Sequence, residues 1–312
     1  MFVFGPVPSR RLGNSLGINH IPAKNCTYAC VYCQVGKTTS LTIKRMNYYS
    51  VEKILEEVQQ KIAGSRQIGV NIDYLTLVPD GEPTLDLRLG TLIRSLKEFQ
   101  IPVAVISNAS LIDRPDVRDD LSSADWVSLK LDSVIEREWK KINRPHGRLV
   151  LADILDGIKN FRQMFTGELV TESMLVAGIN DAEISIRELR DYLLDLGPTR
   201  ACLSIPIRPP AEDWVKPPAP DQLGKVLKIF SEKVDFLQLL FEAEASDFRS
   251  TSNFVEDLLS IIAVHPIREE ALRIMTDQAG ESWDTVNRLI ASSQIQAIRY
   301  RDDIFYLSRH ES

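Results

Sequence analysis

The stretch Cys26-Thr27-Tyr28-Ala29-Cys30-Val31-Tyr32-Cys33 holds three of the four cysteines of a 312-residue chain, in the spacing C-x3-C-x2-C. Three thiolates on one loop can bind three irons of a cubane cluster and leave the fourth iron without a protein ligand. An open metal position in a protein is a place where a ligand other than protein binds. The spacing therefore favours an iron–sulfur cluster.

Two other interpretations of the three cysteines stay open at this point: a zinc knuckle and three buried thiols. A structural zinc site has four ligands, commonly as paired C-x2-C units or as mixtures of Cys and His. His20 is poorly placed to be the fourth ligand, and Cys202 is far away in sequence. Neither residue completes a recognisable zinc motif.

The spacing, with Tyr32 directly before the third cysteine, resembles the signature of the radical S-adenosylmethionine (SAM) enzymes. The resemblance implies that Cys26, Cys30 and Cys33 bind a 4Fe-4S cluster and that SAM chelates the open iron. In that superfamily an electron from the cluster cleaves SAM to a 5′-deoxyadenosyl radical. The same resemblance places Tyr32 against the adenine of SAM, mainly through its backbone.

The composition, with 44% hydrophobic and 26% charged residues, is ordinary for a globular protein. No apolar run approaches the ~20 residues of a membrane span, and the segment from Met1 to Pro6 lacks the features of a signal peptide. Four cysteines, three of them clustered, do not make a disulfide framework. We therefore expect a protein of the reducing cytoplasm with no membrane partner.

Charge is distributed unevenly along the chain. Residues 1–50 contain no Asp or Glu but six Lys and Arg, including the adjacent Arg10 and Arg11. Because the whole chain has a net charge of −6, residues 51–312 sum to −12. A basic field around a cluster attracts an anionic substrate. The simpler alternative is that these lysines and arginines are solvated surface residues.

The apolar pattern alternates between strands and helices, which is typical of βα units and a parallel sheet. Ser50 is the expected N-cap of the first helix. A turn-rich lead-in is expected at 5–13. Strands are expected at 15–19, 72–78, 102–107, 125–131, 169–176 and 200–207, and helices at 51–62, 87–99, 150–165, 183–196 and 221–232, followed by a strand-like 236–241.

Two architectures fit this α/β alternation, an open doubly wound sheet and a barrel. In both, chemistry collects at the carboxyl ends of the strands. Unusual polar residues follow five of the expected strands, at 79–84, 108–110, Lys130 with Asp132, 178–181 and 208–210. The chain has no G-x-G-x-x-G or Walker A motif, so a nicotinamide or nucleoside-triphosphate enzyme is unsupported. Lys130 is a candidate for an imine with a carbonyl substrate, although a pairing with Asp132 favours a structural or positioning role.

Gly81-Glu82-Pro83 resembles the second signature of the radical SAM barrel, the edge that binds the SAM amino group. Gly allows close backbone approach, Glu82 or a carbonyl accepts from the ammonium, and Pro83 fixes the exit of the chain. Ser107-Asn108 resembles the Ser/Thr-Asn-Gly strand end near SAM, with Ala109 in place of Gly. Asn180, in Gly178-Ile179-Asn180, lies where such enzymes contact ribose or adenine.

The resemblance covers about residues 5–215 and narrows to a subgroup of iron–sulfur oxidoreductases related to the tRNA-wyosine synthases. It is carried by Gly-Pro-Val-Pro-Ser-Arg-Arg-Leu-Gly near the start, Asp-Gly-Glu-Pro-Thr-Leu, Asn143-Arg144-Pro145 and Pro206-x-Arg-Pro-Pro-x-Glu. It implies a partial (β/α)6 TIM-type barrel. The chain lacks the extra cysteines that hold the second cluster of wyosine synthases, so their reaction is not carried over.

The barrel is expected to end near the rigid Pro217-Pro218-Ala219-Pro220, and from about residue 246 the pattern changes. Helices at 254–262, 268–275 and 282–291 and a hairpin at 295–308 resemble a winged helix-turn-helix. Residues 245–312 hold seven arginines, no lysine and eleven acids, which disfavours a duplex-DNA binder because that function needs phosphate neutralisation. We expect this region to dock a protein or peptide, or to pack on the barrel.

We therefore predict a radical SAM barrel at 1–245 and a winged helix at 246–312. The expected partners are an electron donor such as flavodoxin or ferredoxin and an anionic substrate, which tRNA would satisfy. Residues predicted to bind that substrate are Arg10, Arg11, Arg144 and Arg208. The alternatives are a protein or peptide substrate recognised by the winged helix, and a non-enzymatic iron–sulfur sensor. The Gly-Glu-Pro edge distinguishes an enzyme from the sensor, because a sensor needs no site for an amino-acid group beside its cluster.

Overall fold

The computed structural model describes residues 1–231, 236–241, 248–251 and 253–309. Its central element is an eight-stranded sheet in which every neighbouring pair from β2 to β10 is parallel, whereas β1 is antiparallel to β2. In spatial order the strands are β1 (Val3–Ser9), β2 (Gly13–Ile18), β5 (Tyr74–Leu77), β6 (Val103–Ser107), β7 (Trp126–Lys130), β8 (Glu168–Met174), β9 (Arg200–Ser204) and β10 (Leu237–Leu240). All six predicted strands and the strand-like segment before Phe241 are thus confirmed.

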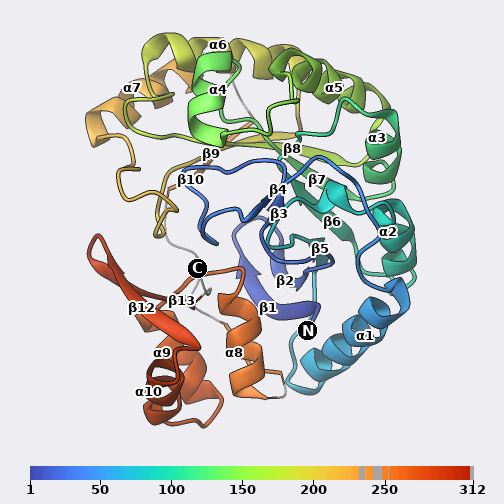
Figure 1. Cartoon of the computed structure of the whole chain (residues 1–312), viewed down its shortest axis with the longest axis vertical. Helices are drawn as coiled ribbons and strands as arrows, with labels where there is room; N and C mark the ends of the chain where they lie inside the picture. Colours follow the sequence, from blue (N-terminus) through green and yellow to red (C-terminus); the bar gives the residue numbers. More distant parts are fainter. Residues whose placement is uncertain (232–235, 242–247, 252, 310–312) are drawn as a thin grey trace.

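Helices cover the outer face of this curved sheet (Figure 1). They are α1 (Val51–Gln67), α2 (Leu89–Lys97), α3 (Pro115–Leu121), α4 (Glu136–Asn143), α5 (Leu151–Met164), α6 (Glu183–Leu196) and α7 (Pro220–Ser231). The five predicted helices are present, and the Ser50 side chain caps α1 by accepting from the backbone N–H of Lys53. The short helices α3 and α4 were not predicted. Two short strands, β3 (Asn25–Cys26) and β4 (Ser40–Leu41), and a 3-10 turn at Pro83–Leu85 lie in the loops.

The expectation of a turn-rich lead-in at 5–13 is largely wrong, because Val3–Ser9 forms strand β1. Within the described residues β1 stands at the end of the strand order, next to β2 alone. Proline is tolerated in an edge strand because its missing N–H faces no partner, so Pro6 and Pro8 did not prevent pairing. Phe4 is paired in register with Gly17 of β2.

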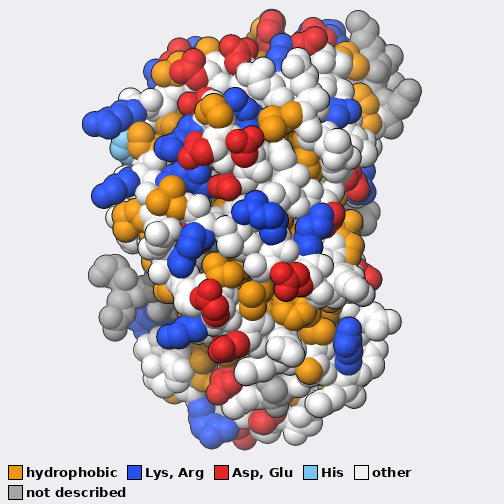
Figure 2. Space-filling view, turned by 90° about the vertical axis from the view of Figure 1, so that its right-hand side faces the viewer, with side chains coloured by type: hydrophobic (Ala, Val, Ile, Leu, Met, Phe, Trp, Pro, Cys, Tyr) orange, Lys and Arg blue, Asp and Glu red, His pale blue; other side chains and the backbone are white. Residues whose placement is uncertain are grey.

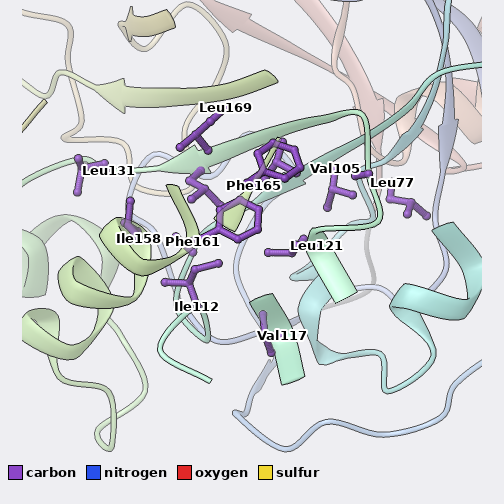
Figure 3. Packing of buried hydrophobic residues seen from close by; sticks show 14 of the residues in the cluster. Leu77, Val105, Ile112, Val117, Leu121, Leu131, Ile158, Phe161, Phe165 and Leu169 are labelled. Atoms are coloured by element: carbon purple, nitrogen blue, oxygen red, sulfur yellow. The ribbon is translucent and has the colours of Figure 1, made fainter. Parts of the chain in front are cut away.

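The main hydrophobic core lies between the sheet and its helices (Figure 3). Leu77, Val105 and Leu169 project from the strands, and Ile158 and Phe161 meet them from α5. The rings of Phe161 and Phe165 stack with their centroids 4.7 Å apart. This layer fixes the strands, so the loops at their carboxyl ends have a rigid base.

The C-terminal unit, residues 248–251 and 253–309, has its own small sheet in the order β11-β13-β12. The three predicted helices and the hairpin are present; the added short strand is β11. The elements are α8 (Phe254–Ile262), β11 (Ile267–Arg268), α9 (Glu269–Gln278), α10 (Trp283–Ala291), β12 (Ile295–Tyr300) and β13 (Asp303–Ser308). The winged-helix assignment stays a prediction, and the predicted boundary at 245/246 lies outside the described residues.

The C-terminal unit packs against strand β1 and helix α1 (Figure 1). Phe4 and Val7 of β1 belong to the same hydrophobic cluster as Leu258 and Ile261 of α8. Lys61 of α1 forms a buried salt bridge with Asp257 of α8, whose side chain is 0% exposed. The hydrophobic core of the C-terminal unit therefore includes residues of β1, the edge strand of the large sheet.

One face of the outer surface is chemically mixed. Figure 2 shows one face of the molecule, on which basic, acidic and hydrophobic side chains are interspersed. Among the helices that the structure describes, none combines the length and the apolar character needed to cross a bilayer.

Candidate functional site

A cavity of about 330 Å³ lies at the carboxyl ends of the parallel strands. Its lining combines three groups of side chains that are distant in sequence: the cysteine loop, the strand ends, and basic residues. The predicted site residues on its wall are Arg11, Cys26, Cys30, Tyr32, Cys33, Gly81, Glu82, Ser107, Asn108, Lys130 and Arg208. The structure thus brings together most of the residues that the sequence singled out.

The end of α4 holds the cysteine loop in place. The backbone N–H of Ala29 donates to the carbonyl of Asn143 (3.0 Å), and that of Val31 donates to the carbonyl of Ile142 (2.9 Å). Arg144 ends the helix in the left-handed region, with φ 43°, so that the chain turns and His146 N–H reaches the carbonyl of Thr27 (2.9 Å). The Asn143-Arg144-Pro145 motif therefore positions the loop of the three cysteines.

The three thiols line one cavity, and two of them have an amide donor beside the sulfur. Burial raises the pKa of Cys30 and Cys33, and raises that of Cys26 to about 12, so bound iron would be needed to keep them as thiolates. The amide Nδ2 of Asn108 lies 3.5 Å from Cys26 Sγ, and that of Asn143 lies 3.4 Å from Cys30 Sγ. Such donors stabilise the negative charge of cluster sulfurs. The donor set fits an iron–sulfur cluster.

The fourth cysteine, Cys202, lies apart from the three that line the cavity. Among the described residues no three His, Cys, Asp or Glu side chains converge closely enough to hold a single metal ion. Cys202 is buried in β9 and does not line the cavity. Burial raises its pKa to about 11, as expected for an inert structural thiol.

Close backbone contact joins the cysteine loop to the Gly81-Glu82-Pro83 turn. The N–H of Glu82 donates to the carbonyl of Asn25 (3.0 Å), and a Cβ at Gly81 would lie 2.1 Å from that same oxygen. Only glycine fits at this position. Beside it, Lys24 and Asp80 form a buried salt bridge of 3.0 Å between the two loops.

The Glu82 carboxylate is fully engaged within the protein. Its Oε1 accepts from the Thr84 hydroxyl (2.6 Å) and from the Ser107 hydroxyl (2.7 Å), and its Oε2 accepts from the Asn108 N–H (2.8 Å). Burial raises its pKa, and these donors oppose the rise. Two acceptors were predicted for the SAM amino group, the Glu82 carboxylate and a backbone carbonyl. The carboxylate is already hydrogen-bonded to residues at the ends of two strands. The geometry therefore favours the backbone carbonyl. Ala109, which stands where the family has Gly, has φ 64°.

Asp132 lies behind the cavity wall and holds residues of the wall in place by hydrogen bonds. Its Oδ2 accepts from the Tyr32 hydroxyl (2.5 Å) and from Asn143 Nδ2 (2.6 Å), and its Oδ1 accepts from Met174 N–H (2.8 Å). Asn180 is buried, and its amide bonds the backbone of Asp132 (2.7 Å) and Met174 (2.9 Å). Asp132 and Asn180 are not among the residues that line the cavity, so direct roles in catalysis and SAM binding stay predictions.

Glu172, in the interior of β8, was missed by the sequence analysis. Its Oε1 accepts from Lys130 Nζ (2.6 Å), and its Oε2 accepts from Arg11. Burial alone would raise its pKa, but Arg11 and Lys130 outweigh that effect and hold the pKa well below its usual range. Lys130 therefore pairs with Glu172 and not with Asp132.

Lys130 is held as a cation. Burial acts to lower its pKa, but Glu172 and Asp132 raise it above the ordinary value. Its Nζ also lies 5.4 Å from the centroid of the Tyr32 ring. A nucleophilic amine must be neutral, so this geometry favours the positioning role over the imine.

The predicted substrate-binding arginines separate into two groups. Arg11 and Arg208 line the main cavity, and Arg10 lines a smaller cavity beside it. Arg144 lies on the outside, where its Nη1 donates to Glu212 (2.6 Å). Arg208 donates to Gln34 Oε1 (2.8 Å) and lies 2.8 Å from Nε2 of His265. His265, together with Val264, brings the C-terminal unit into the cavity wall, a role the sequence did not reveal.

Solved structures share the fold at low sequence identity. A radical SAM methyltransferase from Sphaerobacter thermophilus aligns with a TM-score of 0.55 and 14% identity, over 73% of this chain and 66% of that protein. TYW1 with a lysine–pyruvate adduct bound aligns with a TM-score of 0.54 and 18% identity, over 70% and 73% of the two chains. At such identities the likeness concerns the fold.

Sequence relatives are closer. A UPF0026 protein of Methanocaldococcus jannaschii is 44% identical over 311 residues, which cover 99% of this chain and 96% of that protein. The model of the radical SAM superfamily matches residues 20–189, a span that contains the three cysteines and the Gly-Glu-Pro edge. Members of the superfamily use a 4Fe-4S cluster and SAM. The chain therefore belongs to the radical SAM superfamily and is an enzyme of that class.

Proposed function

We propose that this enzyme generates a radical from SAM inside the barrel and uses it to modify an anionic substrate. One observation carries the proposal: the three cysteines, Gly81 and Glu82 of the Gly-Glu-Pro edge, and the cations Arg11, Lys130 and Arg208 line a single cavity, of which Pro83 is not part. In this proposal the architecture is a partial (β/α)6 barrel with a C-terminal winged helix, in the cytoplasm. The electron comes from a donor such as flavodoxin or ferredoxin.

The side chains of the cavity have distinct tasks. Cys26, Cys30 and Cys33 hold the cluster, and the amides of Asn108 and Asn143 donate to two of their sulfurs. The backbone of the Gly81-Glu82-Pro83 turn, fixed by the Glu82 carboxylate, accepts the amino group of SAM. The bound cofactors supply one electron and a carbon-centred radical. The apolar side chains of the wall, among them Val35, Val78 and Ile106, keep water away from that radical.

The charge of the wall supports an anionic substrate. Three cations, Arg11, Lys130 and Arg208, line the wall together with the carboxylates Glu82 and Glu172. Basic side chains on the wall of a cleft attract an anionic substrate. An RNA base carried on tRNA is the narrower prediction within this class. Because the C-terminal unit forms part of the wall, a peptide substrate would also enter beside Val264 and His265.

The first experiment measures iron and SAM cleavage. Anaerobic reconstitution should give about four irons per chain, and the reduced protein should convert SAM to 5′-deoxyadenosine, slowly even without substrate. Cys26→Ala should abolish both. Cys202→Ala is the matched control, because Cys202 is buried outside the cavity, and should retain both.

Two outcomes would contradict this assignment. Full iron content after Cys26→Ala would overturn the ligand set. Fully loaded, reduced protein that neither binds nor cleaves SAM would contradict the proposed reaction and favour the sensor alternative.

A further inference from the structure

Asp132 is a buried carboxylate, 3% exposed, that does not line the main cavity. Its Oδ1 accepts from the backbone N–H of Met174 (2.8 Å), and its Oδ2 accepts from the Tyr32 hydroxyl and from Nδ2 of Asn143. The amide of Asn180 donates to its backbone carbonyl (2.7 Å). Its side chain therefore acts on the site through its charge and through the residues that it contacts.

A single amide group separates the Asp132 carboxylate from a predicted cluster ligand. Nδ2 of Asn143 lies 2.6 Å from Asp132 Oδ2 and 3.4 Å from the sulfur of Cys30. The side-chain nitrogen of Asn carries two hydrogens, so one is available for each of these acceptors. Asn143 is buried and is the last residue of α4, the helix whose backbone carbonyls hold the cysteine loop.

The carboxylate determines which end of the Asn143 amide faces the sulfur. An amide side chain can turn over, which exchanges its nitrogen and its oxygen at nearly the same positions. An ionised carboxylate only accepts hydrogen bonds. If Asn143 turned over, its oxygen would face an oxygen of Asp132 and the sulfur of Cys30, and both contacts would be repulsive. Asp132 therefore holds Asn143 with its donor toward the sulfur.

We propose that Asp132 is a positioning residue for the cluster: it acts through Asn143 to keep an N–H donor on the sulfur of Cys30, and in this way it helps to set the reduction potential. A hydrogen bond to a ligand sulfur stabilises the negative charge that reduction adds, so it raises the potential. This role rests on the proposed function, because it concerns the same cluster, but it assigns no proton transfer to Asp132.

A change at Asp132 alone would mix several effects. Its negative charge disfavours an added electron, so removing the charge raises the potential, whereas releasing the Asn143 amide lowers it. The carboxylate also accepts from Tyr32, whose ring centroid lies 5.4 Å from Lys130 Nζ. A double-mutant cycle isolates the part of the effect that passes through Asn143.

The test measures the midpoint potential of the full, anaerobically reconstituted chain by redox titration monitored by electron paramagnetic resonance, without SAM. Asn143→Leu removes the donor and should shift the potential to a more negative value. Asp132→Asn removes the charge and the acceptor-only group. Its shift should be more negative in the wild-type background than in the Asn143→Leu background, because only the wild-type background has a donor to lose.

Glu138→Gln is the matched control. Glu138 is a buried carboxylate in the same helix as Asn143, and it accepts from the hydroxyls of Ser133 (2.7 Å) and Ser185 (2.6 Å). The substitution removes a buried charge of the same sign and leaves the described contacts of the Asn143 amide intact. Its shift in potential should be the same with and without Asn143→Leu, since independent sites are additive.

Equal shifts from Asp132→Asn in the two backgrounds would overturn the positioning role, because the carboxylate would then act by charge or packing alone. A wild-type potential in Asn143→Leu would show that the amide does not act on the sulfur. If Asp132→Asn binds no iron, Asp132→Ser repeats the cycle, since its smaller side chain sets no amide donor against the Met174 N–H. Loss of iron in both Asp132 variants, or in Asn143→Leu, would contradict a role confined to the potential.

The same samples separate this role from the proposed function. Formation of 5′-deoxyadenosine by the wild-type chain tests the proposed reaction. Additive potentials in a chain that cleaves SAM would overturn the role of Asp132 and leave the reaction intact. Coupled potentials in a chain that does not cleave SAM would support the role of Asp132 while contradicting the proposed reaction.

Discussion

Glu172 shows what a sequence reveals about a single residue and what it conceals. The alternation in Glu168–Met174 places Val170 and Glu172 on the same face of β8, but an acid in a strand ordinarily marks a solvated face. Its meaning depends on Arg11, in the turn between β1 and β2, and on Lys130, at the end of β7. The cysteine ligands, by contrast, were predictable because all three are carried on one short loop.

Replacing Glu172 by Gln should destabilise the fold strongly. The change leaves Arg11 and Lys130 without their carboxylate, and breaking a buried ion pair by removing one partner costs about 3–5 kcal/mol. Anaerobic denaturant unfolding measures the loss. Glu183→Gln, which removes an exposed pair with Arg187, should cost about 0.5 kcal/mol or less. Equal effects of the two substitutions would contradict the central role of Glu172.

The pH dependence follows from the lowered pKa of Glu172. A carboxylate whose pKa is lower in the folded state adds stability above its unfolded pKa and loses it as the pH falls toward the folded value. The difference between wild type and Glu172→Gln should therefore be constant above about pH 5 and shrink by about 1.4 kcal/mol per unit below about pH 4. A difference that grows in acid would contradict the lowered pKa.

At the scale of elements, the six parallel strands were predictable because each is a short apolar run bounded by turn residues. Strand β1 was not predictable, because Pro6 and Pro8 ordinarily indicate a turn. Proline is tolerated in a strand only at the edge of a sheet, and the sequence does not show that β1 lies there. The short helix α4 was missed although its last residues, Asn143 and Arg144, were noted as a motif. Its role in holding the cysteine loop depends on tertiary hydrogen bonds that no local pattern records.

The pairing of β1 with β2 depends on Gly17. A Cβ at this position would lie 2.0 Å from the Phe4 ring, so Gly17→Ala should destabilise by about 1–3 kcal/mol through overpacking. Gly224→Ala is the matched control, since Gly224 is exposed in α7 and its Cβ would meet nothing within 4 Å. It should stabilise by about 0.5–1 kcal/mol. Thermal unfolding of both variants measures the two signs, and a neutral Gly17→Ala would argue against the close Phe4 contact.

At the scale of the whole molecule, the acidic C-terminal unit was expected to dock a peptide or to pack on the barrel. Packing is what the structure shows, through the shared cluster of Phe4, Val7 and α8. Tyr300 adds a hydrogen bond to the carbonyl of Pro206 (3.2 Å). Composition alone cannot reveal these contacts, because β1 and α8 are more than 200 positions apart and Tyr300 is 94 positions from Pro206.

Phe4→Ala should loosen the C-terminal unit as well as the sheet. Removing a buried phenyl ring costs about 3–5 kcal/mol, and part of this ring's contacts belong to the cluster of α8. Hydrogen exchange should therefore rise in the amides of α8. Leu121→Ala, a buried truncation in the core around α3, is the control and should leave α8 protected relative to the rest. Equal protection of α8 in both variants would contradict the shared core.

The packing of β1 against α8 also has a consequence for the order of events during synthesis. Strand β1 leaves the ribosome first, but its partner α8 and the wall residue His265 follow more than 200 residues after Cys33. At 5–20 residues per second this interval lasts roughly 10–50 s. During that time the cysteine loop exists while the wall beside it is incomplete. Iron and sulfide can reach the nascent loop before the C-terminal unit closes over it.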